Sequence, residues 1–451
     1  MAEKQFNKVL VANRGEIAIR VFRACYDLGL HTVAMYSNED TFSLFRTKAD
    51  EAYLIGENKS PLGAYLDIDG IIDLAKRRNV DAIHPGYGFL SENADFARAC
   101  EEAGITFIGP SSKILAQMGD KLTAKAIAKA CNVPTIPGSA EPLKDGEEAL
   151  AKAKEYGFPI ILKAAGGGGG RGIRKVEDPA DAGKAFTEAH AEAEAAFGDG
   201  ECYMEKFVSP AHHVEVQVLA DAHGNVVSLG ERECSVQRRN QKLVEESPAP
   251  CLDAHPGVRE RMHKAARDLT RAVGYVGVGT IEFLFADDGS FYFMEMNTRL
   301  QVEHPVTEFV SGVDLVKWQL RVASGAELPF SADNIDARGH AIECRINAET
   351  PEFLPSCGEV TMLHVPGGPQ VRFDSALYVG AVVPPYYDSL LGKLIVCSST
   401  REEAIRKMRS ALGELVVEGV AENSELHLDI LSNPEFVSGN YHTNLMEHLY
   451  E

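Results

Sequence analysis

The stretch Ile281-Glu-Phe-Leu-Phe-Ala-Asp-Asp-Gly-Ser-Phe-Tyr-Phe-Met-Glu-Met-Asn297 decides the fold of the central part of the chain. Its two apolar runs flank Asp287-Asp-Gly289, which is typical of a β-hairpin. A two-residue turn at Asp288 and Gly289 places Glu282 directly opposite Glu295. Facing carboxylates repel each other across a sheet. A divalent cation removes this conflict, because Mg²⁺ with a bound triphosphate takes one or two carboxylates. The hairpin therefore predicts a metal site; one protonated or surface glutamate is the alternative.

The alternation of the hairpin continues beyond its second run. Asn297, Arg299, Gln301 and Glu303 follow Glu295 at every second position. A strand that faces a core would carry apolar residues there. We therefore expect one strand edge to display metal ligands, then an arginine that binds an anion, then a carboxylate available as a base.

The segment Lys163-Ala-Ala-Gly-Gly-Gly-Gly-Gly-Arg-Gly172 contains five adjacent glycines. It matches G-x-G-x-x-G only formally, because a predicted strand follows it rather than the helix of a dinucleotide site. A glycine-rich turn between antiparallel strands can instead fold its N–H groups over a triphosphate, and adjacent glycines are costly to order without such a role. We expect a phosphate-covering flap, with Lys121 and Lys163 neutralising phosphate charge; a flexible linker is the alternative.

Two further segments carry candidate ligands. Residues 233–242 are rich in cations and include Lys242, but a basic surface loop explains that cluster equally well. His212 and His213 are neighbours in a predicted strand, so their side chains point to opposite faces and a shared ion is improbable. After them Val214, Val216 and Val218 alternate with polar residues, as in a strand with one buried face.

Length and patterning indicate several units in a mixed α/β chain. At roughly 150 residues per domain, 451 residues suggest about three domains. Strand, helix and strand signals alternate near the N-terminus, which predicts an open parallel α/β domain over residues 1–115. We place a second unit at 116–328, which includes a small lid subdomain at 136–206, and a third, of mixed strands and helices, at 335–443.

Composition excludes several classes of protein. Lys plus Arg number 45 and Asp plus Glu 66, so the net charge of −21 disfavours nucleic acid and anionic lipid as partners. No apolar stretch approaches the 18 residues of a membrane span, and the first residues show no signal or transit character. Nine scattered cysteines without a CxxC pair indicate reduced thiols. We expect a cytoplasmic protein.

Taken together, the motifs resemble those of biotin carboxylase, the ATP-grasp enzyme of biotin-dependent carboxylases. The resemblance runs essentially from end to end. It is carried by residues 12–18, 84–93, 118–121, 163–172, 203–206, 213–215, 295–308, 343–349 and 384–389. It implies an ATP-grasp fold preceded by an open parallel α/β domain, with a mobile lid and a C-terminal mixed α/β domain.

The resemblance also assigns roles to individual residues. The ATP contacts it implies are Lys121, Lys163, the backbone of Gly169 and Gly170, Glu205, Lys206, Phe207, Val208, His213 and Asn240. Glu282, Glu295 and Asn297 are similar to the ligands of one or two Mg²⁺ or Mn²⁺ ions. Lys242, Arg299, Gln301, the backbone of Val302 and Glu303 look like the bicarbonate pocket. Arg345 and Tyr87 look like the biotin contacts.

The family reaction has two halves. ATP phosphorylates bicarbonate to carboxyphosphate, and the carboxyl group then passes to N1′ of biotin. By resemblance Glu303 is the base, and Lys242, Arg299 and Arg345 complete the catalytic set. The chain contains no Met-Lys-Met biotinylation site, so we expect biotin on a separate biotin carboxyl carrier protein, a carboxyltransferase partner and a homodimer. Acetyl-CoA carboxylase in fatty acid synthesis is the preferred assignment; a pyruvate or other acyl-CoA carboxylase is the alternative.

The chain departs from the family pattern at several positions. Asn240 stands where the family often has His, and Ala421-Glu-Asn423 replaces a more usual Lys-Thr-Asn. Asp27 stands where Glu is common beside Arg23, a pair associated with the dimer interface of the family. Two rival interpretations remain: another ATP-grasp ligase of the carbamoyl-phosphate or purine-synthesis type, and a non-catalytic scaffold on the same fold.

Overall fold

The computed structural model describes residues 6–139, 141–165, 173–198, 200–331 and 337–449. The glycine run lies outside these ranges, and with it Gly169 and Gly170, two of the expected ATP contacts. Three main sheets organise the described residues: a five-stranded parallel sheet, an eight-stranded antiparallel sheet and a three-stranded sheet. The expected mixed α/β architecture is confirmed.

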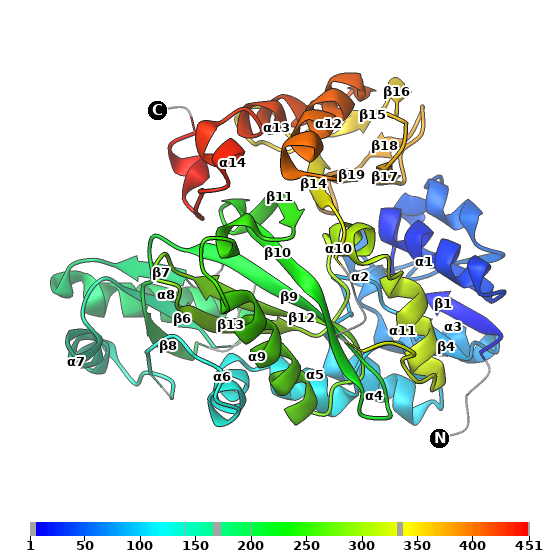
Figure 1. Ribbon diagram of the computed structural model, residues 1–451. Coiled ribbons are helices and arrows are strands. Elements are labelled where there is room, and N and C mark those ends of the chain that lie inside the picture. Colours follow the sequence, from blue (N-terminus) through cyan, green and yellow to red (C-terminus); the bar gives the residue numbers. More distant parts are fainter. Residues whose placement is uncertain (1–5, 140, 166–172, 199, 332–336, 450–451) are drawn as a thin grey trace.

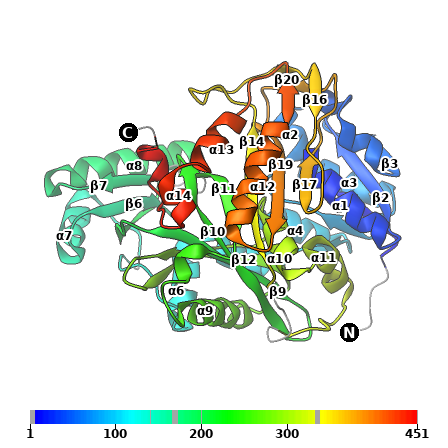
Figure 2. The same cartoon turned by 45° about the horizontal axis from the view of Figure 1, so that its top comes forward.

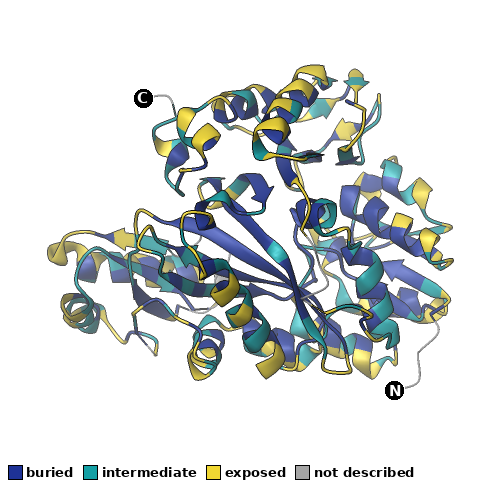
Figure 3. Ribbon diagram, viewed as in Figure 1, coloured by how far each residue is buried: buried dark blue, intermediate teal, exposed yellow. Residues whose placement is uncertain are grey.

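The N-terminal region is built on the parallel sheet, in the order β3-β2-β1-β4-β5. Its inner strands β2, β1 and β4 are largely buried, whereas the edge strand β3 is only partly buried (Figure 3). In α1 the side chains of Ile17, Val21 and Cys25 are buried, as their helical spacing predicts. The elements are β1 (Lys8–Val11), α1 (Gly15–Asp27), β2 (His31–Tyr36), β3 (Glu51–Leu54), α2 (Pro61–Tyr65), α3 (Ile68–Arg77), β4 (Ala82–His84), α4 (Ala94–Glu102), β5 (Thr106–Phe107) and α5 (Ser112–Gly119).

A separate three-stranded sheet forms the segment that we expect to be the lid. Strand β6 pairs antiparallel with both β7 and β8, so the glycine run joins two antiparallel strands, as predicted. Two helices pack on this sheet, and together they form a small core of their own, at the left of Figure 1. The elements are α7 (Gly146–Tyr156), β6 (Ile160–Ala164), β7 (Ile173–Val176), α8 (Ala182–Phe197) and β8 (Cys202–Lys206).

The central antiparallel sheet has the order β13-β12-β9-β10-β11-β14-β19-β17. It continues from the middle of the chain into the C-terminal region, because β11 pairs with β14 (Figures 1 and 2). The sequence did not predict this continuity. The strands are β9 (His212–Ala220), β10 (Val226–Arg238), β11 (Gln241–Ser247), β12 (Gly277–Phe285), β13 (Phe291–Asn297), β14 (His340–Asn347), β17 (Val371–Ser375) and β19 (Leu390–Ser398).

Helices cover both ends of this central sheet. Helix α9 packs on β9 and β10, and α12 packs on β14 and β19. The helices are α6 (Lys121–Ala130), α9 (Val258–Ala272), α10 (His304–Ser311), α11 (Leu315–Ser324), α12 (Arg401–Glu414), α13 (Ser424–Ile430) and α14 (Pro434–Ser438). The remaining short strands are β15 (Gly358–Glu359), β16 (Met362–His364), β18 (Val382–Val383) and β20 (Val416–Glu418). No helix in the described part of the chain is long and apolar enough to cross a membrane.

Candidate active site

The hairpin of β12 and β13 places Glu282 opposite Glu295, which confirms the predicted pairing. The pairing does not arise from the two-residue turn that we expected at Asp288 and Gly289. Phe285 pairs with Phe291, so the turn is longer than two residues and the register near it is shifted by one position. A β-bulge at Met294 then restores the predicted pairing. The two carboxylates face each other because the bulge offsets the longer turn.

The two glutamates of this pair have different surroundings. Glu282 Oε1 accepts from Lys242 Nζ at 3.0 Å and from Asn297 Nδ2 at 2.8 Å, and His213 Nε2 lies 3.1 Å from Glu282 Oε2. Burial alone would raise the pKa of Glu282, but Lys242 and His213 hold it well below its usual value. Lys121 Nζ lies 3.9 Å from Glu295 Oε2. Burial and the charge of Glu282 raise the pKa of Glu295. A cation between them would relieve this repulsion.

The donor set suits a hard cation. Glu282, Glu295 and the side-chain amide of Asn297 offer oxygen atoms at one end of the hairpin. Mg²⁺ and Mn²⁺ prefer carboxylate and carbonyl oxygens over nitrogen and sulfur. These three residues therefore fit the predicted divalent-metal site.

A cluster of ion pairs surrounds Glu303. Lys242 Nζ lies 2.7 Å from Glu303 Oε1 and 2.7 Å from Glu215 Oε2. Arg345 Nη2 lies 3.0 Å from the other oxygen of Glu303. Burial would raise the pKa of Glu303, but Lys242 and Arg345 outweigh it, so the pKa is lowered. Glu303 is therefore a buried, ionised carboxylate held between two cations, which is the protonation state that a base requires.

The prediction that the strand continues through Glu303 is wrong. Strand β13 ends at Asn297, and Glu303 is the residue that precedes α10. The physical reason is Arg232, which is fully buried and donates to Gln301 Oε1 at 2.6 Å and Thr307 Oγ1 at 2.9 Å. These bonds hold residues 301–307 against the sheet in a non-extended path. The side chains of Gln301 and Glu303 still reach the site, but from a loop.

The other residues of the predicted bicarbonate pocket lie near this loop. Arg299 donates to Glu92 at 2.9 Å and to Asn297 Oδ1 at 2.9 Å. Gln301 Nε2 donates to Glu282 Oε1 at 2.9 Å, which connects the pocket to the metal ligands. The carbonyl of Val302 accepts from Lys393 Nζ at 2.9 Å.

Of the two predicted biotin contacts, Arg345 approaches Glu303 from the C-terminal part of the central sheet, whereas Tyr87 follows β4 in the N-terminal region. Arg345, on β14, donates from Nε to Glu245 Oε1 at 2.6 Å. Tyr87 donates to Glu16, and Lys393 Nζ lies 3.3 Å from the same carboxylate oxygen. Lys393 thus bonds both to the loop that carries Val302 and to the partner of Tyr87. Arg345 therefore contacts Glu303, which also belongs to the predicted bicarbonate pocket.

The predicted ATP contacts are divided among several elements. Glu205, on β8, is buried and accepts from Lys163 at 2.7 Å and Lys125 at 3.0 Å, which ties the predicted lid to α6. Burial lowers the pKa of Lys121. Lys206 Nζ donates to the backbone carbonyls of Gly157 and Phe158, at 3.0 and 3.3 Å.

The remaining predicted ATP contacts are Phe207, Val208 and Asn240. The N–H of Phe207 donates to Pro159 O at 3.0 Å, and Val208 follows the end of β8 and is only partly buried. Asn240 lies at the exposed turn between β10 and β11 with a positive φ of 63°. Asparagine tolerates that backbone conformation well.

Several charged residues of the site were missed by sequence reasoning. Glu215 and Gln217 were read as the solvent face of a half-buried strand, but both are fully buried. They share one face of β9 with His213, and that face lines the site. The signal was the run of polar residues at positions 213, 215 and 217. Arg232, Glu245 and Lys393 had no signal beyond their charge, whereas Glu92 and Glu343 lie in segments 84–93 and 343–349, which carry the resemblance.

Comparisons with known proteins agree with this geometry. The chain matches three family descriptions: "Biotin carboxylase, N-terminal domain" over residues 5–115, "Carbamoyl-phosphate synthase L chain, ATP binding domain" over 120–331, and "Biotin carboxylase C-terminal domain" over 343–448. It is 50% identical to biotin carboxylase 1 of Bacillus subtilis, over 98% of each chain. It is 49% identical to the small subunit of 2-oxoglutarate carboxylase from Hydrogenobacter thermophilus, over 98% of this chain and 93% of the relative.

Solved structures show the same similarity. Biotin carboxylase from Campylobacter jejuni, in a complex with β,γ-ATP, superposes with a TM-score of 0.96 at 47% identity, over 98% of this chain and 99% of that one. The biotin carboxylase domain dimer of 2-oxoglutarate carboxylase from Hydrogenobacter thermophilus, in complex with MgADP, ADP and bicarbonate, gives 0.96 at 48% identity, over 99% of each chain. The resemblance in the sequence is thereby confirmed, and the chain belongs to the biotin carboxylase family.

Proposed function

We propose that this chain carboxylates biotin on a separate carrier protein, using ATP and bicarbonate, through carboxyphosphate. One observation carries the proposal: Lys242 and Arg345 converge on the buried, ionised Glu303. The same lysine bonds to Glu282, one of the paired glutamates. One connected group of contacts thus joins the proposed base, Glu303, to two cations and to the candidate metal ligand Glu282.

Each predicted residue has a part in this proposal. Glu282, Glu295 and Asn297 would hold Mg²⁺ or Mn²⁺, which supplies charge neutralisation for the triphosphate. Glu303 takes the proton of bicarbonate, while Lys242 and Arg299 neutralise the anion. Lys121, Lys163, Glu205 and His213, with the other expected contacts, position ATP.

The second half-reaction uses the opposite side of Glu303. Carboxyphosphate breaks down to CO₂ and phosphate, the phosphate accepts the N1′ proton of biotin, and N1′ then takes up CO₂. Arg345 stabilises the negative charge that develops on the ureido oxygen. Tyr87, which donates to Glu16, is the second residue that we assign to biotin.

We also propose that residues 136–206 close over ATP as a lid. Carboxyphosphate hydrolyses in water, so the site must exclude solvent during turnover. The segment has its own sheet and its own core, which supports movement as a unit. The domain boundaries at 1–115, 116–328 and 335–443 belong to the same proposal.

The proposal also names the partners of the chain and the acceptor of the carboxyl group. A carrier protein, a carboxyltransferase, a homodimer and a cytoplasmic acetyl-CoA carboxylase in fatty acid synthesis form the preferred assignment. Relatives from a pyruvate carboxylase and from a 2-oxoglutarate carboxylase, each 49% identical to this chain, make another carboxylase the alternative. Within the chain, Asp27 pairs with Lys317 at 2.6 Å and Arg23 with Asp374 at 3.6 Å, so both contribute to the monomer as well.

The test measures ADP release and carboxybiotin together, with free biotin as acceptor. We expect ADP release to require bicarbonate and carboxybiotin to form. Turnover with ammonia in place of biotin would favour a carbamoyl-phosphate type of ligase, and absence of ADP would favour a scaffold. Capture of a biotinylated protein with the tagged chain, followed by assay with acetyl-CoA or pyruvate, identifies the complex.

A further inference from the structure

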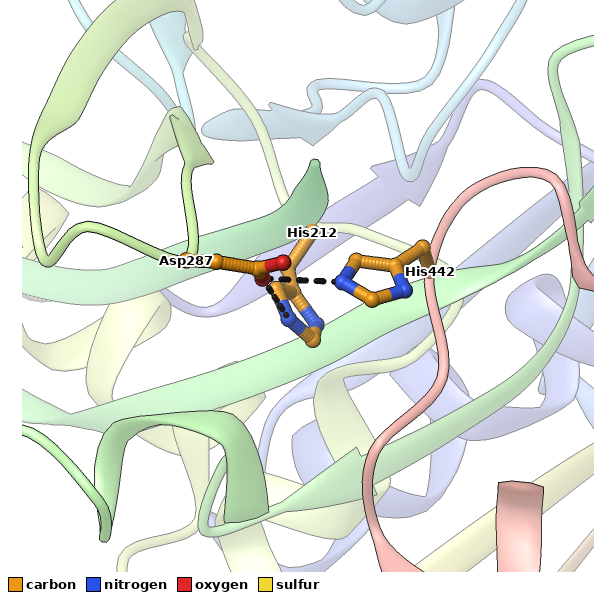
Figure 4. Close-up of side chains that lie close together, drawn as sticks. All are labelled: His212, Asp287 and His442. Carbon is orange, nitrogen blue, oxygen red and sulfur yellow. Dashed lines mark hydrogen bonds and ion pairs between the residues drawn. The ribbon is translucent and has the colours of Figure 1, made fainter. Parts of the chain in front are cut away.

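Two histidines and one aspartate meet outside the site described above. His212 begins β9, Asp287 lies in the turn between β12 and β13, and His442 follows α14 near the C-terminus (Figure 4). His442 Nε2 lies 2.9 Å from Asp287 Oδ1, and His212 Nε2 lies 3.6 Å from the same oxygen. One ligand atom of each residue lies within 4.8 Å of the others.

His442 and Asp287 are hydrogen-bonded in the structure, and the spacing of the three residues also suits a shared cation. The rings of His212 and His442 have centroids 4.5 Å apart, so two protonated imidazoles would repel each other beside a single carboxylate. Zinc–ligand bonds of about 2.0–2.1 Å in a tetrahedron place ligand atoms about 3.3 Å apart. The observed 2.9 and 3.6 Å bracket that value.

A second carboxylate lies near the other ring nitrogen of His212. Glu233, fully buried on β10, has Oε1 3.5 Å from His212 Nδ1. His212 is itself buried, and among the described residues its Nδ1 has no hydrogen-bond partner. Metal-binding histidines commonly direct their second nitrogen at such a carboxylate, which leaves the first nitrogen free to bind the ion.

Glu233 and Cys251 offer a competing site with His212. Both of these residues are buried. The favoured position for a cation is therefore on the other side of His212, where Asp287 is exposed and allows access from solvent.

We propose that His212, Asp287 and His442 bind one transition-metal ion of the Zn²⁺ class, with water as the fourth ligand. Two imidazoles with one carboxylate favour Zn²⁺, Co²⁺ or Ni²⁺ over Mg²⁺, so the site differs in selectivity from the paired glutamates. The ion would join the C-terminal segment to the hairpin that carries Glu282. The N–H of Thr443 already donates to Ala211 O at 3.0 Å, which holds the C-terminal segment beside the start of β9.

Cobalt tests the proposal, because tetrahedral Co²⁺ absorbs strongly in the visible range. The purified full chain is titrated with Co²⁺ in excess Mg²⁺, so that the paired glutamates are already occupied. We expect one equivalent to give a tetrahedral spectrum, and Zn²⁺ to displace it and raise the unfolding midpoint by mass action. His442→Gln and Asp287→Asn should weaken binding at least about 10-fold, the lower range for loss even of a supporting residue.

His448→Gln is the matched control, because His448 is also C-terminal and pairs with a carboxylate, Glu435, at 3.1 Å. It should bind Co²⁺ like the wild type. The proposal is overturned if the wild-type spectrum is octahedral or absent, or if His442→Gln and Asp287→Asn retain full affinity. A sulfur-to-cobalt charge-transfer band would also overturn it, since that band would place the ion on a cysteine.

Discussion

Arg345 and Glu303 are in direct contact, with Nη2 of the arginine 3.0 Å from Oε2 of the glutamate. Arg345 comes from β14 and Glu303 from the start of α10. They meet because the central sheet continues into the C-terminal region through the pairing of β11 with β14. The contact links the residue proposed to face biotin with the base proposed for bicarbonate, so the two half-reactions are separable by mutation only if each residue has its own role.

The first prediction separates those roles. Arg345→Ala should lower carboxybiotin formation by roughly 10²–10³-fold, the usual cost of one oxyanion donor, and retain much of the bicarbonate-dependent ATPase. Glu303→Gln should lose both activities. Removing the guanidinium also raises the pKa of Glu303, since Arg345 lowers it now, so the ATPase of Arg345→Ala should need a higher pH.

Parallel assays of ADP and carboxybiotin over a range of pH decide this prediction. Arg345→Lys is the control, because it keeps the charge but not the planar fork; we expect it to restore the pH profile of the ATPase and not carboxylation. Equal loss of both activities in a folded Arg345→Ala protein would assign Arg345 to the bicarbonate site.

The second prediction concerns the paired glutamates. Glu295→Gln should raise the Mg²⁺ concentration needed for half-maximal turnover and lower the maximal rate, because an amide is a weaker ligand than a carboxylate for a hard cation. Asp288→Asn, an exposed change in the turn of the same hairpin, should leave both quantities unchanged. Wild-type metal dependence of Glu295→Gln would show that this carboxylate does not bind the ion.

Local patterns in the sequence were sufficient for much of this site. The apolar runs on either side of Asp287-Asp-Gly289 fixed the hairpin, and the repulsion between Glu282 and Glu295 pointed to a cation. The bulge at Met294 was not predictable, because no residue in that run marks a break in the ladder. The predicted pairing was correct since the bulge and the longer turn cancel.

Residues that depend on long-range packing were beyond sequence reasoning. Arg232 bonds to Glu215, Gln217 and Thr280 on neighbouring strands and to Gln301 and Thr307 in a distant segment. None of these contacts is local in the chain. The continuous alternation beyond Asn297 therefore suggested a strand, whereas the bonds to Arg232 hold a loop.

The third prediction tests that buried arginine. Arg232→Met should lower the free energy of unfolding by about 3–5 kcal/mol, because the fully buried Glu215 loses one of its two cationic partners and keeps Lys242, at 2.7 Å, as the other. Adding Glu215→Gln should recover part of the loss, since it removes the buried charge that Arg232 no longer balances. Urea denaturation measures both variants. Arg77→Met, at an exposed pair with Asp73, is the control and should not change stability; an equally small effect at Arg232 would contradict the prediction.

The last prediction follows from a second carboxyl pair, Glu245 and Glu343, which face each other on β11 and β14 and are fully buried. Burial raises the pKa of Glu245 to about 7, even though Arg345 opposes the shift, and it also raises that of Glu343. A glutamate in the unfolded chain has a pKa of about 4.3. At Glu245 the folded protein therefore keeps a proton that the unfolded chain releases, and the stability this contributes is complete below about pH 4.3 and lost as the pH rises through about 7.

Glu245→Gln should flatten this decline, because its side chain stays neutral at every pH and its carbonyl still accepts from Arg345. The neighbouring Glu246 is the matched control, since its pKa is lowered to about 2, against the effect of burial, by its bond to His340 and the charge of Arg401. Its stabilisation is lost only as the pH falls below about 4.3. Glu246→Gln should therefore lower the unfolding midpoint by the same amount throughout the window from about pH 4.3 to 7, and leave its slope unchanged. Thermal unfolding across that window decides between them, and a wild-type slope in Glu245→Gln would mean that Glu245 is ionised in the folded protein throughout.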